Sequence, residues 1–221
     1  MSRIFFCLIF CFNYSFAQNL FNENGNKMGL WTGSYKSGEL RYVGNFNDGK
    51  EVGCFKYFYK SGNLESKVCY FIPGSNSKAI LYFSKGQVKA LGNYCNKLRC
   101  GLWEYFDDKG NILSKENYSN GKLNGDVIFY YNGLISESYE YLDDKKNGKA
   151  LVFYPNGAIQ NLSTYLDDKL HGEFSVFDLK GNLTETGEYS QGFREGEWSV
   201  FNYNKKISSV FYEKGEKINE K

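Results

Sequence analysis

Residues 101–122 read GLWEYFDDKGNILSKENYSNGK, and every feature that repeats along the chain is present in them. Two runs rich in aromatic and aliphatic residues flank the polar segment 107–111, and the polar pair Asn120-Gly121 follows. Aromatic and β-branched residues favour strands, whereas Asn, Asp and Gly favour tight turns. The segment therefore predicts a β-hairpin that turns directly into the next strand.

The same pattern recurs every 23 or 24 residues from residue 29 onward. A glycine opens each unit, with a serine in the third, and the units begin at Gly29, Gly53, Ser77, Gly101, Gly125, Gly148, Gly172 and Gly196. An aliphatic residue follows the turn inside each unit, at Leu40, Leu64, Val88, Ile112, Ile135, Ile159, Leu183 and Ile207. An aromatic residue lies near each unit's end, at Phe46, Tyr70, Tyr94, Tyr118, Tyr141, Tyr165, Tyr189 and Tyr212. Three columns that keep one period indicate an internal repeat.

The repeats predict an all-β fold. Each unit supplies two strands, and because all the connections are short, consecutive strands must be antiparallel. We expect an elongated antiparallel meander of about eight β-hairpins, with 15 or 16 strands, over residues 29–221, and a lead-in over residues 18–28. At ~4.8 Å between strands, such an array is on the order of 75 Å long.

The first 17 residues are typical of a secretory signal peptide. Arg3 supplies a positive charge, residues 4–12 form an apolar run, and Ser15 and Ala17 are small residues placed for cleavage after Ala17. The apolar run is too short for a permanent membrane span. We expect residues 1–17 to be removed and the mature protein to be exported to the periplasm, the cell envelope or the extracellular space.

Aromatic residues make up 19% of the chain, more than a small core requires. Alternation along the strands predicts that Trp103, Tyr105, Ile112 and Tyr118 share one face. A single sheet has no second layer, so the rings of neighbouring hairpins must shield one another. A second aromatic column is expected on the opposite face, where it forms a candidate binding surface: Phe58, Tyr82, Phe106, Tyr130, Phe153, Phe177 and Phe201.

Four cysteines follow the signal peptide, and an even number in an exported protein favours disulfides. The hairpin pairing sets Cys54 directly opposite Cys69, and a turn at Lys97-Leu98 sets Cys95 opposite Cys100. Facing residues of antiparallel strands lie within ~5.5 Å, inside disulfide range. The sequence therefore predicts the disulfides Cys54–Cys69 and Cys95–Cys100. The spacings of these cysteines do not suit a zinc site.

The repeating pattern Gly-x-Trp-x-x-Tyr/Phe, followed by Gly-x-Leu/Ile, an aromatic residue and Asn/Asp-Gly-Lys, resembles the MORN repeat in its bacterial variant form. Residues 29–50 and 101–122 are the cleanest copies, and the resemblance extends from about Asn19 to the C-terminus. It implies elongated arrays of β-hairpins that contact proteins or membranes. Some relatives are labelled YwqK-type antitoxins. The resemblance brings no catalytic residues to this chain.

Charge and residue types argue against several classes of function. Lys and Arg number 27 and Asp and Glu 25, without a basic stripe in the sequence, so we expect no nucleic-acid binding. The single histidine, His171, falls in a turn. The pairs Asp107-Asp108, Asp143-Asp144 and Asp167-Asp168 are interpreted as solvated turns rather than metal or glycosidase sites. We expect no catalytic residue, no metal and no cofactor, and a protein that is not an enzyme.

The leading hypothesis is a protein-binding or scaffold module of the cell envelope whose partner is another protein. Carbohydrate or cell-wall binding is an alternative, provided that the rings of the second aromatic column are open to solvent. Immunity to a toxin and association with a membrane surface are further alternatives. The near-zero net charge offers little attraction to anionic lipid.

Overall fold

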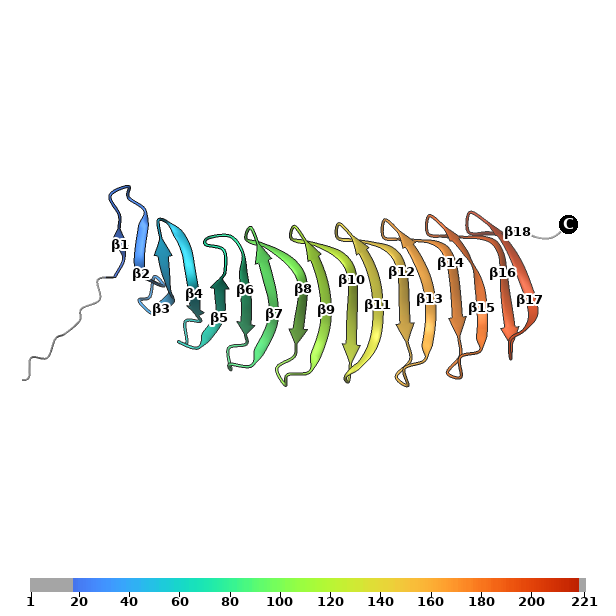
Figure 1. The fold of residues 1–221 in the computed structure, drawn as a ribbon. Helices are drawn as coiled ribbons and strands as arrows, with labels where there is room; N and C mark the ends of the chain where they lie inside the picture. The colour runs from blue at the N-terminus through green and yellow to red at the C-terminus, as the bar shows by residue number, and fades with distance from the viewer. Residues whose placement is uncertain (1–17, 219–221) are drawn as a thin grey trace, which may run out of the picture.

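The computed structural model describes residues 18–218, and they form one open sheet of 18 antiparallel strands in which each strand pairs with its neighbours in the chain (Figure 1). The predicted signal peptide lies outside the described residues. The strands are β1 (Leu20–Phe21), β2 (Lys27–Ser34), β3 (Leu40–Asn47), β4 (Lys50–Phe58), β5 (Leu64–Tyr70), β6 (Ser77–Tyr82), β7 (Val88–Cys95), β8 (Leu98–Phe106), β9 (Ile112–Ser119), β10 (Lys122–Tyr131), β11 (Leu134–Leu142), β12 (Lys145–Phe153), β13 (Ile159–Leu166), β14 (Lys169–Phe177), β15 (Leu183–Ser190), β16 (Phe193–Asn202), β17 (Lys205–Glu213) and β18 (Glu216–Ile218). The predicted meander is confirmed.

Short strands close both ends of the array, so the sheet has 18 strands where the sequence predicted 15 or 16. At the N-terminal end β1 pairs with β2, and the indole N–H of Trp31 donates to the Leu20 carbonyl at 3.1 Å. The ring of Phe21 packs edge-on against Trp31, with centroids 5.0 Å apart. At the other end β18 pairs with β17. These caps shorten the free backbone edge that an open sheet presents to other chains.

Six of the seven glycines that open a unit, from Gly53 to Gly196, each lie in a β-bulge. Between β7 and β8, Leu91 pairs with Glu104 but Asn93 pairs with Cys100, so two extra residues are accommodated in β8. All seven opening glycines have φ between 64° and 114°, a region that other residues adopt only with strain. Where Ser77 replaces the glycine, β5 and β6 pair without any shift. The serine is therefore tolerated because that junction has no bulge.

The turns inside the units have two lengths. At Asn132-Gly133 both residues have positive φ (50° and 79°), as the sequence predicted for a two-residue turn. At Asn156-Gly157 that prediction is wrong, because only Gly157 has a positive φ, of 85°. There the turn spans four residues, and the Gly157 N–H donates to the Tyr154 carbonyl at 2.8 Å. We call the edge of the sheet formed by these turns the glycine-turn edge; it lies at the bottom of Figure 1.

Aromatic rings on one face of the sheet form the core. Phe55 and Trp103 are 1% and 0% exposed, although no second layer covers them. Rings from adjacent strands meet edge to face, as in Tyr94 against Trp103 at 5.1 Å and Tyr189 against Trp198 at 5.0 Å. This confirms that neighbouring hairpins shield one another's rings. We call this face the core face and the opposite one the outer face.

Side-chain volume alternates across the junctions between units. At three junctions a glycine, Gly44, Gly92 or Gly187, lies beneath a ring of the next strand. At two others the order is reversed: Val68 faces Ala79, and Tyr139 faces Ala150. A large residue on one strand thus meets a small one on its neighbour, which fills the face without overpacking. The repeating pattern Gly-x-Trp gives no sign of this exchange.

Basic side chains cover the rings at the other edge. The Arg99 guanidinium lies 5.1 Å from the Trp103 ring, and that of Arg194 lies 3.9 Å from the Trp198 ring. Lys146 Nζ lies 3.5 Å from the Tyr139 ring. Each of these cations stands two residues before an opening glycine. They shield ring faces from water and add cation–π attraction.

The predicted position of the aliphatic column is wrong. Ile112 pairs with Phe106 at the end of its hairpin, whereas Ser114 faces Tyr105 on the core face. A bulge between Tyr105 and Phe106 shifts the register and leaves Leu113 as the extra residue. In the last unit Lys206, rather than Ile207, pairs with Phe201, because the turn there has only two residues with positive φ.

Both predicted disulfides are present, on the outer face. Cys54 and Cys69 are directly paired, with Cα atoms 3.9 Å apart. Cys95 and Cys100 are bonded across 5.7 Å, but they are diagonal neighbours rather than the directly opposite pair that was predicted. The turn is centred on Asn96-Lys97, which moves the register by two residues and so leaves both cysteines on the same face.

Candidate binding surface

The seven residues of the predicted binding surface lie at the glycine-turn edge, at or next to the end of the first strand of their hairpins. All seven are half-buried, and none belongs to the large apolar residues that are exposed. Each pairs across the hairpin with the residue after the turn, for example Phe58 with Leu64 and Phe177 with Leu183. The column therefore does not offer the open ring faces that the carbohydrate alternative required.

Hydrogen bonds show a structural role for this column. In three hairpins the tyrosine at the start of the turn donates its hydroxyl to the carbonyl of the column member in the next unit. Tyr35 donates to Phe58 and Tyr59 to Tyr82, both at 2.7 Å, and Tyr154 donates to Phe177 at 2.9 Å. These bonds bridge 23 residues of sequence and tie successive turns together.

Beside the column, the tips of the glycine turns change character half-way along the array. The tips of the first four units carry lysine, at Lys36, Lys60, Lys85 and Lys109. Exposed apolar residues lie at the tips of the fifth, seventh and eighth units, with Tyr131 69%, Leu134 51%, Leu179 59% and Tyr203 76% exposed, and the seventh tip also carries Lys180. We call these four residues the apolar turn edge. Leu179 and Tyr203 lie on consecutive hairpins, ~10 Å apart, and the turn that carries Tyr131 and Leu134 lies two hairpins, or ~19 Å, before Leu179.

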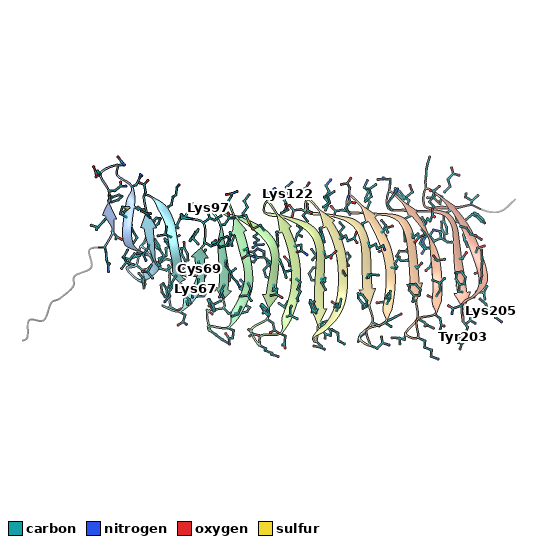
Figure 2. All side chains as sticks on the ribbon, in the orientation of Figure 1. Lys67, Cys69, Lys97, Lys122, Tyr203 and Lys205 are labelled. Atoms are coloured by element: carbon teal, nitrogen blue, oxygen red, sulfur yellow. A yellow bond between two sulfur atoms is a disulfide. The ribbon has the colours of Figure 1, made fainter. Side chains whose placement is uncertain are left out.

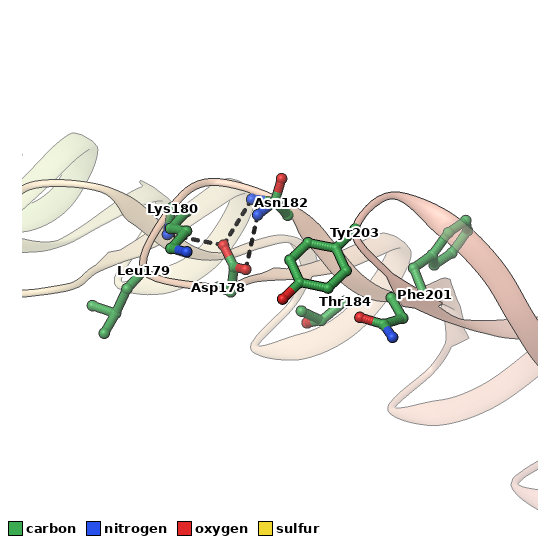
Figure 3. A pocket seen from close by; sticks show the side chains of 8 residues that line it. Asp178, Leu179, Lys180, Asn182, Thr184, Phe201 and Tyr203 are labelled. Carbon is green, nitrogen blue, oxygen red and sulfur yellow. Dashed lines mark hydrogen bonds between the residues drawn. The ribbon is translucent and has the colours of Figure 1, made fainter.

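A pocket of about 330 Å³ lies between the last two apolar tips, and its wall includes Leu179, Phe201 and Tyr203 (Figure 3). Asp178 closes the turn on one side, since its Oδ1 accepts the N–H groups of Lys180 and Asn182 at 2.8 Å. The hydrogen bond from the Asn182 side chain is the main reason that the pKa of this carboxyl is lowered. The charged Asp178 side chain thus holds the turn that presents Leu179.

A second pocket, of about 190 Å³, lies between the fifth and sixth hairpins. Its lining is mostly apolar and includes Tyr131, Leu134, Phe153 and Pro155. Phe153 and Phe201, two members of the predicted column, therefore each border a pocket. Shallow apolar pockets flanked by exposed Tyr and Leu side chains are typical of surfaces that receive side chains of another protein.

The chemistry-bearing residues do not converge on a site. Within residues 18–218, no group of three or more His, Cys, Asp or Glu side chains is placed to hold a metal ion. His171 lies exposed in β14. Asp144 and Asp168 are central turn residues, and each side chain accepts a backbone N–H of the preceding unit, from Leu123 at 2.7 Å and Lys146 at 2.8 Å. These aspartates hold neighbouring turns together. No helix in the described part of the chain could span a membrane.

Comparison with known families agrees with this geometry. Residues 51–71, 99–120 and 146–167 each match the family model described as MORN repeat variant. The chain carries MORN repeat variants. Each matched segment begins shortly before an opening glycine, within or beside the bulge that the glycine makes. MORN repeats indicate a repeat protein with a binding or scaffold role, and the family is generally non-enzymatic.

The MORN array has weak likeness to solved structures. One is the crystal structure of a mutant of S. aureus TarM in complex with fondaparinux, alpha-GlcNAc-glycerol and UDP, with 13% identity, a TM-score of 0.32, and coverage of 43% of this chain and 19% of that chain. Another, of TarM, has 16% identity, a TM-score of 0.30, and coverage of 40% and 18%. The aligned parts span less than a fifth of the TarM chains. No curated protein sequence matches the chain.

Proposed function

We propose that this protein is an exported, non-enzymatic binding module of the cell envelope, and that it engages another protein through the apolar turn edge. The observation that carries the proposal is the row of exposed Tyr131, Leu134, Leu179 and Tyr203 with pockets between them. Exposed tyrosines beside pockets are typical anchors at the centre of protein interfaces. Their spacing suits a partner that lies along several hairpins.

Two further observations support this assignment. The disulfides Cys54–Cys69 and Cys95–Cys100 are typical of proteins that fold in an oxidising compartment, which fits export. The tyrosine bonds between turns hold the edge rigid, so little conformational freedom is lost when a partner binds. The half-buried state of the second aromatic column removes the main argument for sugar stacking.

Site-specific photo-cross-linking tests the proposal. A photoreactive amino acid is placed at position 131, 179 or 203, and at the lysine tips 36, 60 and 85 as matched controls. In cells that make the protein, we expect one adduct of the same mass from all three apolar positions and none from the lysine tips. Leu179→Ser should abolish the adduct at position 203. Equal adducts from test and control positions, or none from either, would overturn the proposal.

A further inference from the structure

The outer face carries unneutralised positive charge near the N-terminal end of the array. Lys56 in β4 pairs directly with Lys67 in β5, and Lys78 in β6 pairs with Cys69. Figure 2 labels Lys67 and Cys69, which lie two positions apart in β5. Within the described part of the chain none of these three lysines forms an ion pair. Like charges directly opposite each other destabilise a sheet. The sequence alone did not reveal this stripe, because only the register brings the lysines together.

The same face carries unneutralised negative charge toward the C-terminal end. Glu173 in β14 pairs with Glu188 in β15, and Glu188 also pairs with Glu195 in β16. Glu173 and Glu188 are exposed, and neither forms an ion pair with any residue from 18 to 218. One face thus holds a repulsive positive pair and a repulsive negative pair at opposite ends. Each end has the charge that would relieve the other.

The two ends cannot meet within one chain, because about ten strands, or ~48 Å, separate β5 from β15. A second copy can bring them together. The two outer faces then lie against each other, related by a two-fold axis that lies between them, parallel to β10. In that arrangement β6 faces β14 of the other copy, and β5 faces β15. A row here means a line of directly paired residues that crosses the strands. Lys78 of one copy and Glu173 of the other lie at the same row. Lys67 of one copy lies one row from Glu188 of the other, which a lysine side chain can reach.

The middle of the outer face is partly apolar. Its central row runs through Leu91, Glu104, Lys115, Ile128, Ser138, Leu151 and Leu162 in the register of β7 to β13, and Lys115 forms an ion pair with Glu104 at 3.3 Å. The two-fold axis places Ile128 on Ile128 of the second copy and Leu91 on Leu162. From β4 to β16 the face is ~58 Å long and, at about five residues per strand, ~17 Å wide. The face of each copy therefore has an area of about 1,000 Å², which is more than each partner buries in a standard protein interface.

We propose that two copies of this chain associate antiparallel through their outer faces, with the lysine end of each on the glutamate end of the other. A polyanion bound at the lysines would leave Glu173 and Glu188 unneutralised, so the second copy accounts for more of the surface. The outer face is distinct from the apolar turn edge. The dimer and the proposed function can therefore fail independently.

Charge reversal in two variants provides the test. One variant carries Lys56→Glu and Lys67→Glu, and the other carries Glu173→Lys and Glu188→Lys. In sedimentation velocity at 50 mM salt we expect wild type to dimerise, each variant alone to associate at least 100-fold more weakly, and an equimolar mixture of the two to recover a heterodimer. Raising the salt concentration to 500 mM should weaken all of these dimers, because screening shortens the reach of the charges.

Matched controls separate specific pairing from net charge. Lys60→Glu with Lys85→Glu makes the same change in net charge at the turn tips, and it should leave the wild-type dimer unchanged. A wild-type protein that stays monomeric at 100 µM in low salt would overturn the proposal. So would a mixture of the two reversed variants that stays monomeric, or a wild-type dimer that either reversal leaves intact.

Discussion

Trp103 lies flat on Gly92 of the preceding strand: a Cβ atom added to Gly92 would fall 2.1 Å from the indole ring. Gly187 stands in the same relation to Trp198, and Gly44 to Phe55. A fully buried tryptophan on a single sheet needs a neighbour with no side chain beneath it. The packing of this protein is therefore set between consecutive MORN units rather than within one.

Replacing Gly92 with alanine tests this packing. The new methyl group must displace the buried Trp103 ring, so we expect the free energy of unfolding to fall by about 2 kcal/mol, as for overpacked cores. Urea denaturation of the oxidised protein measures the change. As a control, Ser61→Ala at an exposed turn should change stability by less than about 0.5 kcal/mol.

A double variant refines that test. Gly92→Val with Trp103→Ala reproduces the pair Val68–Ala79 that occurs one unit earlier. We expect the double variant to lose at least about 1 kcal/mol less than the sum of the two single changes, because the volumes again match. Strict additivity of the two effects would show that the residues do not share one packing site.

The turn at Asn96-Lys97 offers a stabilising change. Lys97 has a φ of 67°, which costs a side-chain-bearing residue about 1 kcal/mol. Lys97→Gly should therefore raise the free energy of unfolding by about that amount. The change loses an ion pair to Glu51 at 3.5 Å, which contributes little because the lysine is 64% exposed. Lys60→Gly, at a turn position without positive φ, should not stabilise the protein.

The two disulfides should contribute unequally. Cys54–Cys69 closes a separation of 15 residues and Cys95–Cys100 one of 5. Because a longer loop loses more entropy in the unfolded chain, removal of the first pair by Cys→Ser changes should cost about 3 kcal/mol and removal of the second about 2 kcal/mol. Thermal unfolding of the two double-serine variants gives the ranking. The reverse order would show that the entropy of loop closure does not dominate the stabilisation by these disulfides.

Alkaline pH should destabilise the array. Burial, with a smaller effect of nearby Glu51, raises the pKa of Tyr70 to about 12. An unfolded tyrosine loses its proton near pH 10. The unfolded chain therefore binds fewer protons between pH 10 and 12, and stability falls as pH rises through that window. Urea midpoints measured from pH 8 to 11.5 should fall less steeply for Tyr70→Phe than for the wild-type protein, and an equally steep fall would contradict this assignment.

Local signals were enough to predict much of this fold. The column of opening glycines and the short turns define the meander, and the pairing about the turns predicts both disulfide partners. Two details were predicted wrongly. A bulge displaces Ile112 from the core face, and the turn centred on Asn96-Lys97 moves the pairing of Cys100 by two positions. A bulge inserts residues without changing the sequence period, so periodicity alone cannot place it.

The candidate site was less accessible to sequence reasoning. Phe153 and Phe201 border pockets, but the exposed residues beside them, such as Leu179 and Tyr203, lie in turns where no column was sought. A comparison of the turn tips would have shown the change from lysine to apolar residues. The facing pairs Lys56–Lys67 and Glu173–Glu188 required the strand register.

Small-angle X-ray scattering of residues 18–221 in 500 mM salt, where the proposed dimer is weakened, tests the central claim most directly. A single open sheet of 18 strands predicts a rod ~85 Å long with a radius of gyration of about 25 Å. A radius of gyration of about 17 Å, the value for a compact globule of this chain length, would contradict the extended array of MORN hairpins.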